Sequence, residues 1–416
     1  MLKNYLKIAL KVLLRRKFFT FISLFGISFT LVVLMVATAI FDHTFAPFPP
    51  EKKSDRSLSI LTIRVENSEK GFAHTGPPSY AFLDRYVRTL PDVGKVSIVT
   101  KMTTALSFKN GEKIKSALKR TDGEFWQIMD FDFLEGGPFT AEDEKNANFV
   151  AVINAATRQR FFGKESALGK TMEVDGQSFR VVGVVANVPV FRNFPFADIW
   201  VPLSTTKGKF SSQELVGSCM GVILAKSRHD LDRIREDFKA QLARVEFSDP
   251  RAFNTIYAAA ETQFENVARE LFSENRSNES HAPQLLAVIV LLMILFMILP
   301  TINLVNINLS RIMERAAEIG VRKAFGASSW KLVGQFVVEN VLQTLVGGAI
   351  GFVLSYLVLQ ILTQSGLIQY AVFQLNYRLF FYGLGLALFF GVFSGVYPAW
   401  KMSRLHPVEA LRGKSV

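Results

Sequence analysis

The segment from Glu314 to Ser328 carries the most specific pattern of residue types in the chain. Acidic residues stand early and basic residues late in it, an order that suits the dipole of a helix. The apolar residues at helical spacing are Ala317, Val321, Ala324 and Phe325, and Gly326 can end the helix. A short amphipathic helix of this kind lies on a lipid surface or docks in a groove on a partner protein.

A second pattern, from Gly163 to Thr171, resembles a phosphate-binding P-loop. Its glycines stand one residue further apart than in that motif, and the segment follows a predicted helix rather than a strand. We therefore interpret it as a loop between a helix and a hairpin. The histidines are scattered without zinc-binding spacing, and the lone Cys219 stands beside an apolar strand. The sequence thus predicts a chain without catalytic residues, metal ligands or a cofactor of its own.

The composition is typical of a chain that is partly membrane-embedded and partly in water. Of the 416 residues, 49% are hydrophobic and 20% are charged, which excludes a disordered chain. A single cysteine excludes a disulfide scaffold. The net charge of +12 is typical of nucleic-acid-binding proteins, but residues 42–281 contain as many basic as acidic residues. The excess lies beside apolar stretches, where anionic lipid attracts it, so no nucleic-acid partner is expected.

Some stretches of the chain are apolar over the roughly 20 residues that a helix needs to cross a bilayer. They are residues 18–41, 282–310, 332–363 and 379–400. Basic residues concentrate in segments 1–17, 311–331 and 401–416. By the positive-inside rule both termini are then cytoplasmic, and residues 42–281 and the short connection 364–378 lie outside. The sequence therefore predicts an α-helical membrane protein with four transmembrane helices and a large α+β extracytoplasmic domain inserted between helices 1 and 2.

The first apolar stretch has an alternative interpretation as a signal peptide cleaved after the pattern Ala37-Thr38-Ala39. Its apolar run is longer than that of most signal peptides, which favours a retained span.

Strand and helix patterns alternate within residues 42–281 and indicate two α+β subdomains. Tight hairpins are predicted at Asn110-Gly111 and Asp175-Gly176, and Asn154 is expected to cap a helix over 155–162. Residues 58–65 are predicted to form one strand. A helix over 261–275 is expected to run directly into the second span.

The predicted spans contain few polar side chains. The ionisable one is Glu339, which is expected near the cytoplasmic interface beside a basic neighbour, with a proton relay as the alternative role. Glycines at the spacing that lets helices approach closely are Gly347, Gly351, Gly391 and Gly395. These glycines serve either contacts within one chain or a dimer face.

The cytoplasmic segments resemble the FtsX-like permease domain. The matching residues are Glu318–Ala327, Gln335–Glu339 and the C-terminal motifs Tyr397–Trp400 and Pro407–Arg412. The segments Leu24–Ile27 and Gly169–Val185 are similar to the MacB-type periplasmic core domain. The resemblance covers nearly the whole chain.

The resemblance implies the permease subunit of a mechanotransmission, or type VII, ABC transporter in the bacterial inner membrane. In such transporters two permease chains pair, and ATP closes a dimer of ATPase subunits below them. The coupling helix that passes on this movement maps onto Glu318, Ile319, Gly320, Val321, Arg322, Lys323, Ala324, Phe325 and Gly326. ATP and Mg would be bound by the ATPase, which is expected to be a separate subunit.

The implied function is export or extraction of an amphiphilic substrate, such as an antibiotic, a peptide or a lipoprotein. The second permease chain is either an identical copy or a sister permease, and the resemblance also allows a periplasmic adaptor and an outer-membrane channel. The alternatives are an FtsX-like regulator of a periplasmic cell-wall hydrolase and a membrane-anchored extracytoplasmic enzyme.

Overall fold

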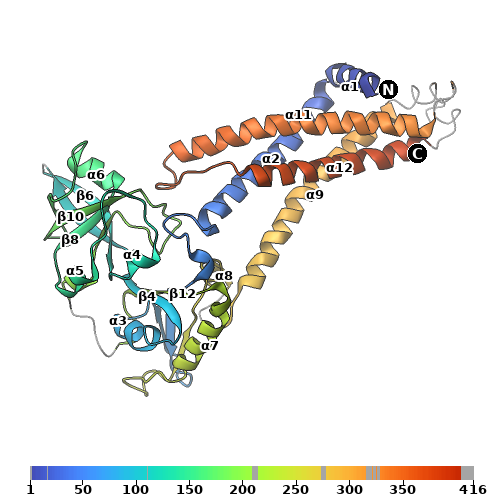
Figure 1. Cartoon of the computed structure of the whole chain (residues 1–416). Helices are drawn as coiled ribbons and strands as arrows, with labels where there is room; N and C mark the ends of the chain where they lie inside the picture. Colours follow the sequence, from blue (N-terminus) through green and yellow to red (C-terminus); the bar gives the residue numbers. More distant parts are fainter. Residues whose placement is uncertain are drawn as a thin grey trace. The chain divides into compact units, whose positions relative to one another are not determined.

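The computed structural model describes residues 2–15, 17–109, 111–208, 214–272, 278–314, 321, 325 and 328–403. The chain forms two compact units (Figure 1). The helical unit comprises residues 1–42, 288–367 and 372–416. The sheet unit comprises residues 43–287 and, from the connection near the C-terminus, residues 368–371.

Long helices make up the helical unit (Figure 1). They are α1 Leu2–Arg15, α2 Lys17–Phe45, α9 Ala282–Glu314, α11 Ser329–Gln364 and α12 Tyr377–Ser403. Of these, α2 and α11 are each long and apolar enough to cross a membrane. The apolar stretches described in α9 and α12 are shorter, Ala282–Phe296 and Tyr377–Phe393. The arrangement with four spans therefore stays a prediction.

A small apolar core joins α2, α11 and α12. Ile27, Leu31 and Met35 of α2 are buried there with Phe380 of α12. The ring of Phe352, on α11, meets the ring of Phe380 edge-on at a centroid distance of 5.0 Å. Packing of this kind holds helices together where lipid supplies no hydrophobic driving force.

Near its end, α2 is also tied to the beginning of α12 by hydrogen bonds. The side chain of Asn376 accepts from the backbone N–H of Leu379 at 3.2 Å and so caps α12. Its Nδ2 donates to the carboxylate of Asp42 at 2.7 Å.

A mixed ten-stranded sheet is the frame of the sheet unit. Its main order is β1-β12-β4-β6-β11-β8-β10-β7, with β5 paired to β6 and β9 paired to β10. The strands are β1 Ser57–Ile60, β4 Val93–Thr100, β5 Thr103–Lys109, β6 Glu112–Thr121, β7 Phe133–Gly136, β8 Val150–Asn154, β9 Thr171–Val174, β10 Gln177–Val185, β11 Ile199–Pro202 and β12 Cys219–Ala225. Both hairpins predicted from the sequence are confirmed as β5–β6 and β9–β10. The pairs β8–β10 and β6–β11 are parallel.

A separate antiparallel sheet has the order β13-β2-β3, formed by Thr255–Ala258, Ile63–Glu66 and Ala73–Gly76. The prediction of one strand over residues 58–65 is therefore wrong, because β1 and β2 belong to different sheets. The reason is a change of phase in the alternation of buried side chains. Leu58 and Ile60 are buried in β1, and Ile63 and Val65 are buried in β2. A shift of one residue in this alternation moves the apolar side chains to the opposite face of the strand. The apolar faces of β1 and β2 therefore pack against different partners.

The helices of the sheet unit are short. They are α3 Tyr80–Phe82, α4 Phe125–Ile128, α5 Ala141–Lys145, α6 Ala155–Phe162, α7 Leu231–Leu242 and α8 Gln263–Phe272. The predicted cap of α6 is confirmed, because Asn154 accepts the backbone N–H of Thr157 at 2.8 Å. The prediction that the helix near residue 261 runs into the second span is wrong, because α8 ends at Phe272 and residues 278–281 are not helical.

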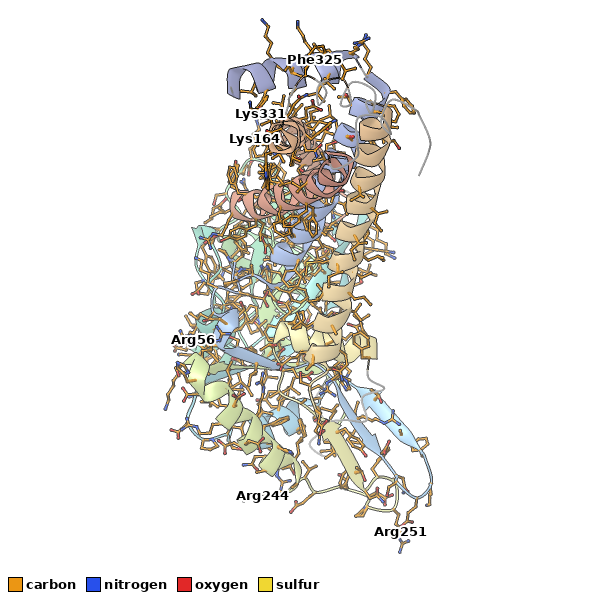
Figure 2. All side chains as sticks on the ribbon, turned by 90° about the vertical axis from the view of Figure 1, so that its right-hand side faces the viewer. Arg56, Lys164, Arg244, Arg251, Phe325 and Lys331 are labelled. Carbon is orange, nitrogen blue, oxygen red and sulfur yellow. The ribbon has the colours of Figure 1, made fainter. Side chains whose placement is uncertain are left out.

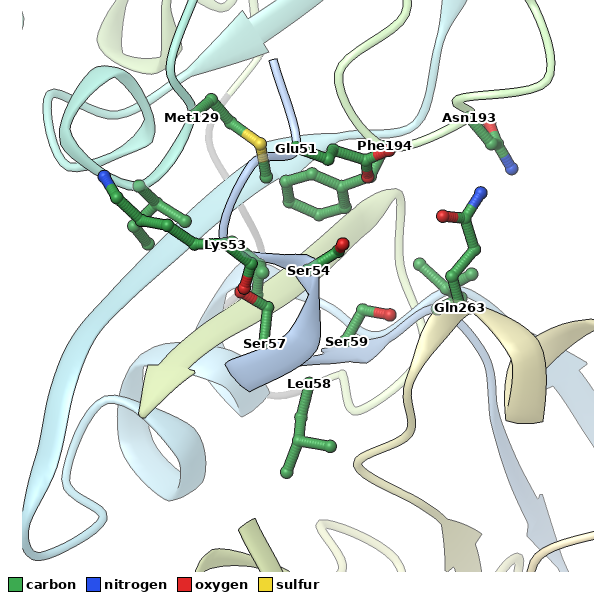
Figure 3. Close-up of a pocket in the computed structure, with 13 residues that line it drawn as sticks. Glu51, Lys53, Ser54, Ser57, Leu58, Ser59, Met129, Asn193, Phe194 and Gln263 are labelled. Carbon is green, nitrogen blue, oxygen red and sulfur yellow. The ribbon is translucent and has the colours of Figure 1, made fainter. Parts of the chain in front are cut away.

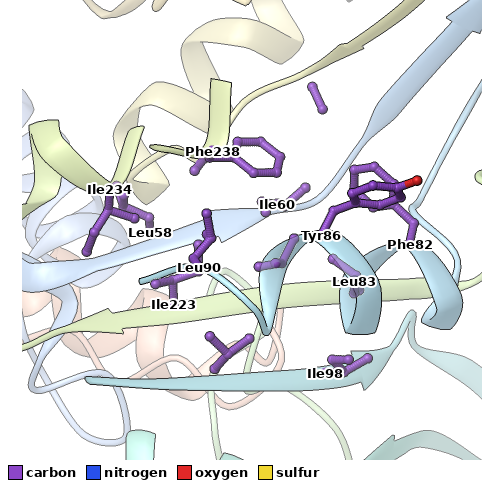
Figure 4. Close-up of a cluster of buried hydrophobic side chains, with 14 of the residues drawn as sticks. Leu58, Ile60, Phe82, Leu83, Tyr86, Leu90, Ile98, Ile223, Ile234 and Phe238 are labelled. Carbon is purple, nitrogen blue, oxygen red and sulfur yellow. The ribbon is translucent and has the colours of Figure 1, made fainter. Parts of the chain in front are cut away.

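Side chains from β1, β4, β12 and α7 enclose one apolar core of the sheet unit (Figure 4). In Figure 4 its labelled members are Leu58, Ile60, Phe82, Leu83, Tyr86, Leu90, Ile98, Ile223, Ile234 and Phe238. A second cluster contains Trp200 and Phe125, and a third contains Phe179. The large sheet is thus buried over much of its area and forms a stiff body.

Candidate functional site

The predicted coupling segment, Glu318 to Gly326, is described at two of its residues. The backbone N–H of Phe325 donates to the carbonyl of Val321 at 3.1 Å, the pairing of an α-helical turn. The other residues of that prediction lie outside the described residues. They are Glu318, Ile319, Gly320, Arg322, Lys323, Ala324 and Gly326.

Large apolar side chains stand exposed at this place in the helical unit (Figure 2). The exposed fraction is 45% for Val321, 88% for Phe325 and 80% for Trp330. Ser328 begins α11 by accepting the backbone N–H of Lys331 at its side chain, which fixes where the helix starts. Val321, Phe325 and Trp330 are called the loop surface below. Aromatic residues exposed in this way are typical of contacts with a partner protein.

The glycines predicted to pack helices lie at close contacts within the chain. A Cβ atom at Gly347 would lie 2.9 Å from Cγ2 of Ile27, and one at Gly351 would lie 3.1 Å from Cβ of Leu31. On α12, a Cβ atom at Gly391 would lie 2.8 Å from the hydroxyl of Thr344. The side-chain surroundings of Gly395 lie outside the described residues. The first two glycines thus let α11 approach α2, and Gly391 lets α12 approach α11.

Glu339 lies in a polar row on α11 that sequence reasoning missed. Its carboxylate is buried and accepts from Nε2 of Gln335 at 3.0 Å. Asn340, one residue on, donates from Nδ2 to the carbonyl of Gly391 at 3.3 Å. The sequence does contain a signal for this polar row, because the polar residues Gln335, Glu339 and Gln343 recur every four residues along the helix. Polar side chains in an apolar helix that bond a neighbouring helix fix the register between the two.

A buried ionic cluster in the sheet unit was also missed. Nη1 of Arg192 lies 3.0 Å from the carboxylate of Glu51, and its Nη2 donates to the carbonyl of Ala46 at 2.8 Å. Lys119, fully buried, donates to the carbonyls of Asn193 and Phe194. The cluster therefore fastens the segment that follows α2 to the loop between β10 and β11.

Burial shifts the acid–base behaviour of this cluster. Loss of solvent lowers the pKa of Lys119 to about 7, although the nearby Glu51 carboxylate opposes the shift. Burial also raises the pKa of Glu51, against the attraction of Arg192. The donors of Lys119 go to backbone carbonyls, so its role is to hold the loop in place.

A small cavity lies beside this cluster (Figure 3). Its volume is about 60 Å³, and Glu51, Ser54, Ser59, Phe194 and Gln263 are among its lining residues. Ligand sites for organic molecules span roughly 300–1,000 Å³, so this cavity suits water instead.

A wider pocket of about 410 Å³ adjoins this cavity on the sheet unit, and Ser54 and Gln263 line both. Apolar and charged side chains line it together: Phe45, Pro47, Leu231 and Phe264 with Asp55, Arg228, Asp232 and Arg235. The rings of Phe45 and Phe264 meet edge-on at 5.4 Å. This volume lies in the range of small-molecule sites, and the mixed lining suits an amphiphilic molecule.

The P-loop-like segment has the structure of an ordinary connection. Gly163 ends α6 with a φ of 65°, and Lys170 forms an ion pair with Glu165 instead of facing an open loop.

Cys219 is fully buried at the beginning of β12, and burial raises the pKa of its thiol to about 12. Within the described ranges, no three His, Cys, Asp or Glu side chains gather where they could hold a metal ion.

Comparison with known proteins finds relatives over most of the chain. It is 28% identical, over 98% of its length, to the macrolide export ATP-binding/permease protein MacB of Wolinella succinogenes. It is 24% identical, over 72% of its length, to an ABC transporter permease of Bacillus subtilis, YknZ, and covers 71% of that protein. The chain spans 60% of the Wolinella MacB and 45% of a Burkholderia pseudomallei MacB.

Among solved structures, the periplasmic region of MacB from Actinobacillus actinomycetemcomitans aligns with 51% of this chain and 92% of its own length. The sequence identity is 15% and the TM-score is 0.37.

Two family models together match most of the chain. The MacB-like periplasmic core domain matches residues 20–241, and the FtsX-like permease C-terminal region matches residues 290–407. The first match covers more than half of the chain, and the second covers most of the helices that follow the sheet unit. The chain therefore belongs to the MacB/FtsX family of ABC transporter permeases, membrane proteins with a periplasmic domain.

Proposed function

We propose that this chain is the permease subunit of a mechanotransmission ABC transporter. A separate ATPase subunit binds ATP and Mg, closes, and moves the loop surface; the movement then passes to the periplasmic sheet unit. The observation that carries this proposal is the exposure of Phe325 and Trp330 beside the helical turn that ends at Phe325. Exposed aromatic side chains on a helical turn and at the beginning of a helix are suited to a groove in a partner protein.

The proposed topology has four spans in the bacterial inner membrane, with both termini in the cytoplasm and residues 42–281 in the periplasm. Helix α1 supports it. Leu10 and Leu14 are exposed on this helix, together with Lys7, Lys11 and Arg15. A helix with exposed leucines next to basic residues suits the anionic inner surface of the membrane.

The proposed assembly contains two permease chains, either identical or sister chains. The apolar surface of α9 supports this, because many of its large side chains are exposed within the described residues. They include Leu291, Leu292, Ile294, Leu295 and Phe296. Lipid and a second permease chain are the two surfaces that cover such a helix.

The proposed substrate is an amphiphile, such as an antibiotic, a peptide or a lipoprotein, exported or extracted on the periplasmic side. The pocket that holds Phe45 and Phe264 beside Arg228 and Arg235 supports this class. Apolar rings contact the hydrocarbon part of such a molecule, and the charges contact its polar end.

Affinity purification of the tagged full-length protein from its own host tests the proposal. The expected result is co-purification of an ABC ATPase with the unchanged protein and its loss with Phe325→Asp. Phe108→Asp, at an exposed position of the sheet unit, is the matched control and should retain the ATPase. Retention of the ATPase by Phe325→Asp would contradict the proposed docking. Capture of a cell-wall hydrolase, with no substrate moved, would favour the FtsX-like regulator instead.

A further inference from the structure

The connection between α11 and α12 contributes four residues to the sheet unit, Ile368–Ala371. The backbone N–H of Val190 donates to the carbonyl of Gln369 at 3.2 Å, and Ala371 is buried. The residues on either side, Leu367 and Val372, are exposed. The connection thus touches the sheet unit at one short point, centred on Tyr370.

Tyr370 has an unusual backbone conformation for its residue type. Its φ is 61°, in the left-handed region that costs a side-chain-bearing residue energy. Such a conformation persists where the surrounding contacts hold it in place. Here the ring of Tyr370 packs against the apolar cluster of Trp200, with the ring of Phe196 at 6.4 Å.

The hydroxyl of Tyr370 donates a hydrogen bond to a carboxylate that also accepts hydrogen bonds from other groups. It donates to Oδ1 of Asp198 at 2.9 Å, and Nδ2 of Asn154 donates to the same oxygen at 2.9 Å. The backbone N–H of Ala117 donates to Oδ2 at 2.8 Å. Asp198 is buried, and its own backbone bonds Ala117 and Asn154. Tyr370 is therefore bonded to a carboxylate that is held by β6 and β8 in the middle of the large sheet.

The Tyr370 hydroxyl stays protonated and therefore remains a hydrogen-bond donor. Burial raises the pKa of Tyr370, and the negative charge of Asp198 raises it further. A hydrogen bond from a neutral donor to a buried carboxylate is stronger than one between neutral groups.

We propose that residues 368–371 are a third attachment of the membrane helices to the periplasmic sheet unit, beside the chain crossings near residues 42 and 287, and that Tyr370 is its positioning residue through Asp198. This inference rests on the proposed function, because an attachment matters for movement that ATP drives. In this proposal the connection between α11 and α12 carries the displacement of these two helices to the centre of the large sheet.

Hydrogen–deuterium exchange on the full-length protein in lipid nanodiscs tests the contact itself. Tyr370→Phe removes only the hydroxyl, and the exchange of the Val190 amide is expected to rise roughly tenfold. Tyr370→Gly also removes the ring, while glycine adopts the positive φ freely, so a larger rise is expected without a change of backbone conformation. Tyr257→Phe is the matched control, because the Tyr257 hydroxyl makes no hydrogen bond to any residue that the structure describes. Unchanged exchange at Val190 in both Tyr370 variants would overturn the proposal.

The same measurement on the complex with its ATPase, with and without ATP, tests the transmission of movement. In the unchanged protein ATP is expected to alter exchange across the sheet unit, and Tyr370→Gly is expected to lose that response. If the unchanged protein shows no response to ATP, the proposed function fails and this inference fails with it. If Tyr370→Gly responds as the unchanged protein does, this inference alone is overturned.

A covalent replacement separates an attachment from a merely structural role. Val190 and Gln369 are joined by a backbone hydrogen bond, so Val190→Cys and Gln369→Cys place two thiols on neighbouring backbone positions, as a disulfide requires. The lone native Cys219 is buried, so it does not compete in the oxidation. In the Tyr370→Gly background the oxidised pair is expected to restore the response to ATP, and a reductant is expected to remove it again. A disulfide that forms and restores nothing would contradict the proposal.

Discussion

Arg269 and Glu261 form a buried two-point ion pair in the sheet unit. Nε of Arg269 lies 2.7 Å from Oε2 of Glu261, and Nη2 lies 2.8 Å from Oε1. The same Nη2 donates to the carbonyl of Glu279 at 3.0 Å, and the backbone of Glu261 exchanges hydrogen bonds of 2.7 and 3.0 Å with Ser59. The pair thus fastens the segment that precedes α9 to the first strand of the large sheet.

Loss of one partner of this pair is expected to destabilise the sheet unit strongly. Arg269→Met leaves the carboxylate of Glu261 buried without its counter-charge, which should lower the free energy of unfolding by about 3–5 kcal/mol. The measurement is denaturant unfolding in nanodiscs, followed by tryptophan fluorescence.

Arg85→Met is the control for that measurement, because its ion pair with Glu246 is exposed and should contribute less than about 1 kcal/mol. The double variant Glu261→Leu/Arg269→Met should lose less stability than Arg269→Met alone, since no charge remains buried. Equal losses in the single and double variants would contradict an effect of the unpaired charge.

Truncation of Phe325 is expected to weaken docking of the ATPase. Phe325→Ala removes the most exposed aromatic ring of the loop surface, and a truncated hot-spot residue costs about 2 kcal/mol or more, roughly a 30-fold rise in Kd. Titration of the purified ATPase against the protein in nanodiscs measures it. Phe108→Ala, on the sheet unit, should leave Kd unchanged. Equal binding by the two variants would show that the ATPase docks elsewhere.

Addition of a methyl group at Gly347 is expected to push α11 away from α2. In Gly347→Ala the new Cβ lies 2.9 Å from Cγ2 and 3.0 Å from Cβ of Ile27, and overpacking of this kind costs about 1–3 kcal/mol. Gly334→Ala is the matched control on the same helix, because a Cβ there meets no atom of a described residue within 4 Å. The control should keep or raise the thermal midpoint in nanodiscs, whereas Gly347→Ala lowers it. Equal midpoints would mean that α11 and α2 do not need this close approach.

The sheet unit should gain stability in mild acid through Glu144. Its carboxylate accepts the backbone N–H of Gly123 at 2.8 Å, and burial raises its pKa to about 7, with the charges of Asp122 and Glu124 adding to the shift. Because this pKa exceeds the unfolded value, the folded protein binds more protons between about pH 4.5 and about 7. The charge therefore costs stability above that window, and the cost disappears as the pH falls through it.

Glu144→Gln tests this, because glutamine keeps an acceptor for Gly123 and carries no charge. The variant should be more stable than the unchanged protein at pH 8, by about 1 kcal/mol after allowance for solvent screening, and no more stable near pH 4.5. Unfolding curves at the two pH values measure the difference. Glu142→Gln, at an exposed neighbouring position, should leave the pH dependence unchanged; the same change in both variants would rule out a specific effect of Glu144.

Local features of the fold could be predicted where the signal was local. The turn at Asp175-Gly176 needs positive φ at both residues, and the structure has φ of 52° and 72° there. Asn154 was identifiable as a cap for the same reason, since its bond to Thr157 lies within one helical turn. The break between β1 and β2 was visible only as a change of phase between Ile60 and Ile63, with no glycine or proline to mark it.

Contacts between distant segments could not be predicted. Nothing near Tyr370 in the sequence indicates that its hydroxyl meets Asp198, 172 residues earlier. The same holds for Arg192 and Glu51, which are 141 residues apart. Such pairs depend on which strands become neighbours, and single-residue patterns carry no information on that choice. The spacing of Val321 and Phe325 is a local signal instead, and the hydrogen bond between their backbones agrees with the helical turn that it predicts. The coupling role of the segment stays a prediction.

The pairing of Ser59 with Glu261 sets the order of events during biosynthesis. The hydroxyl of Ser59 donates to a carbonyl that the ribosome adds 202 residues later, and β1 pairs along its length with β12. In the proposed topology, strand β1 therefore reaches the periplasm before β12 and Glu261, its partners in the sheet unit. Distant pairings of this kind form slowly and leave strand edges open meanwhile. In the proposed topology the newly exported segment thus keeps an open strand edge until the residues just before α9 emerge.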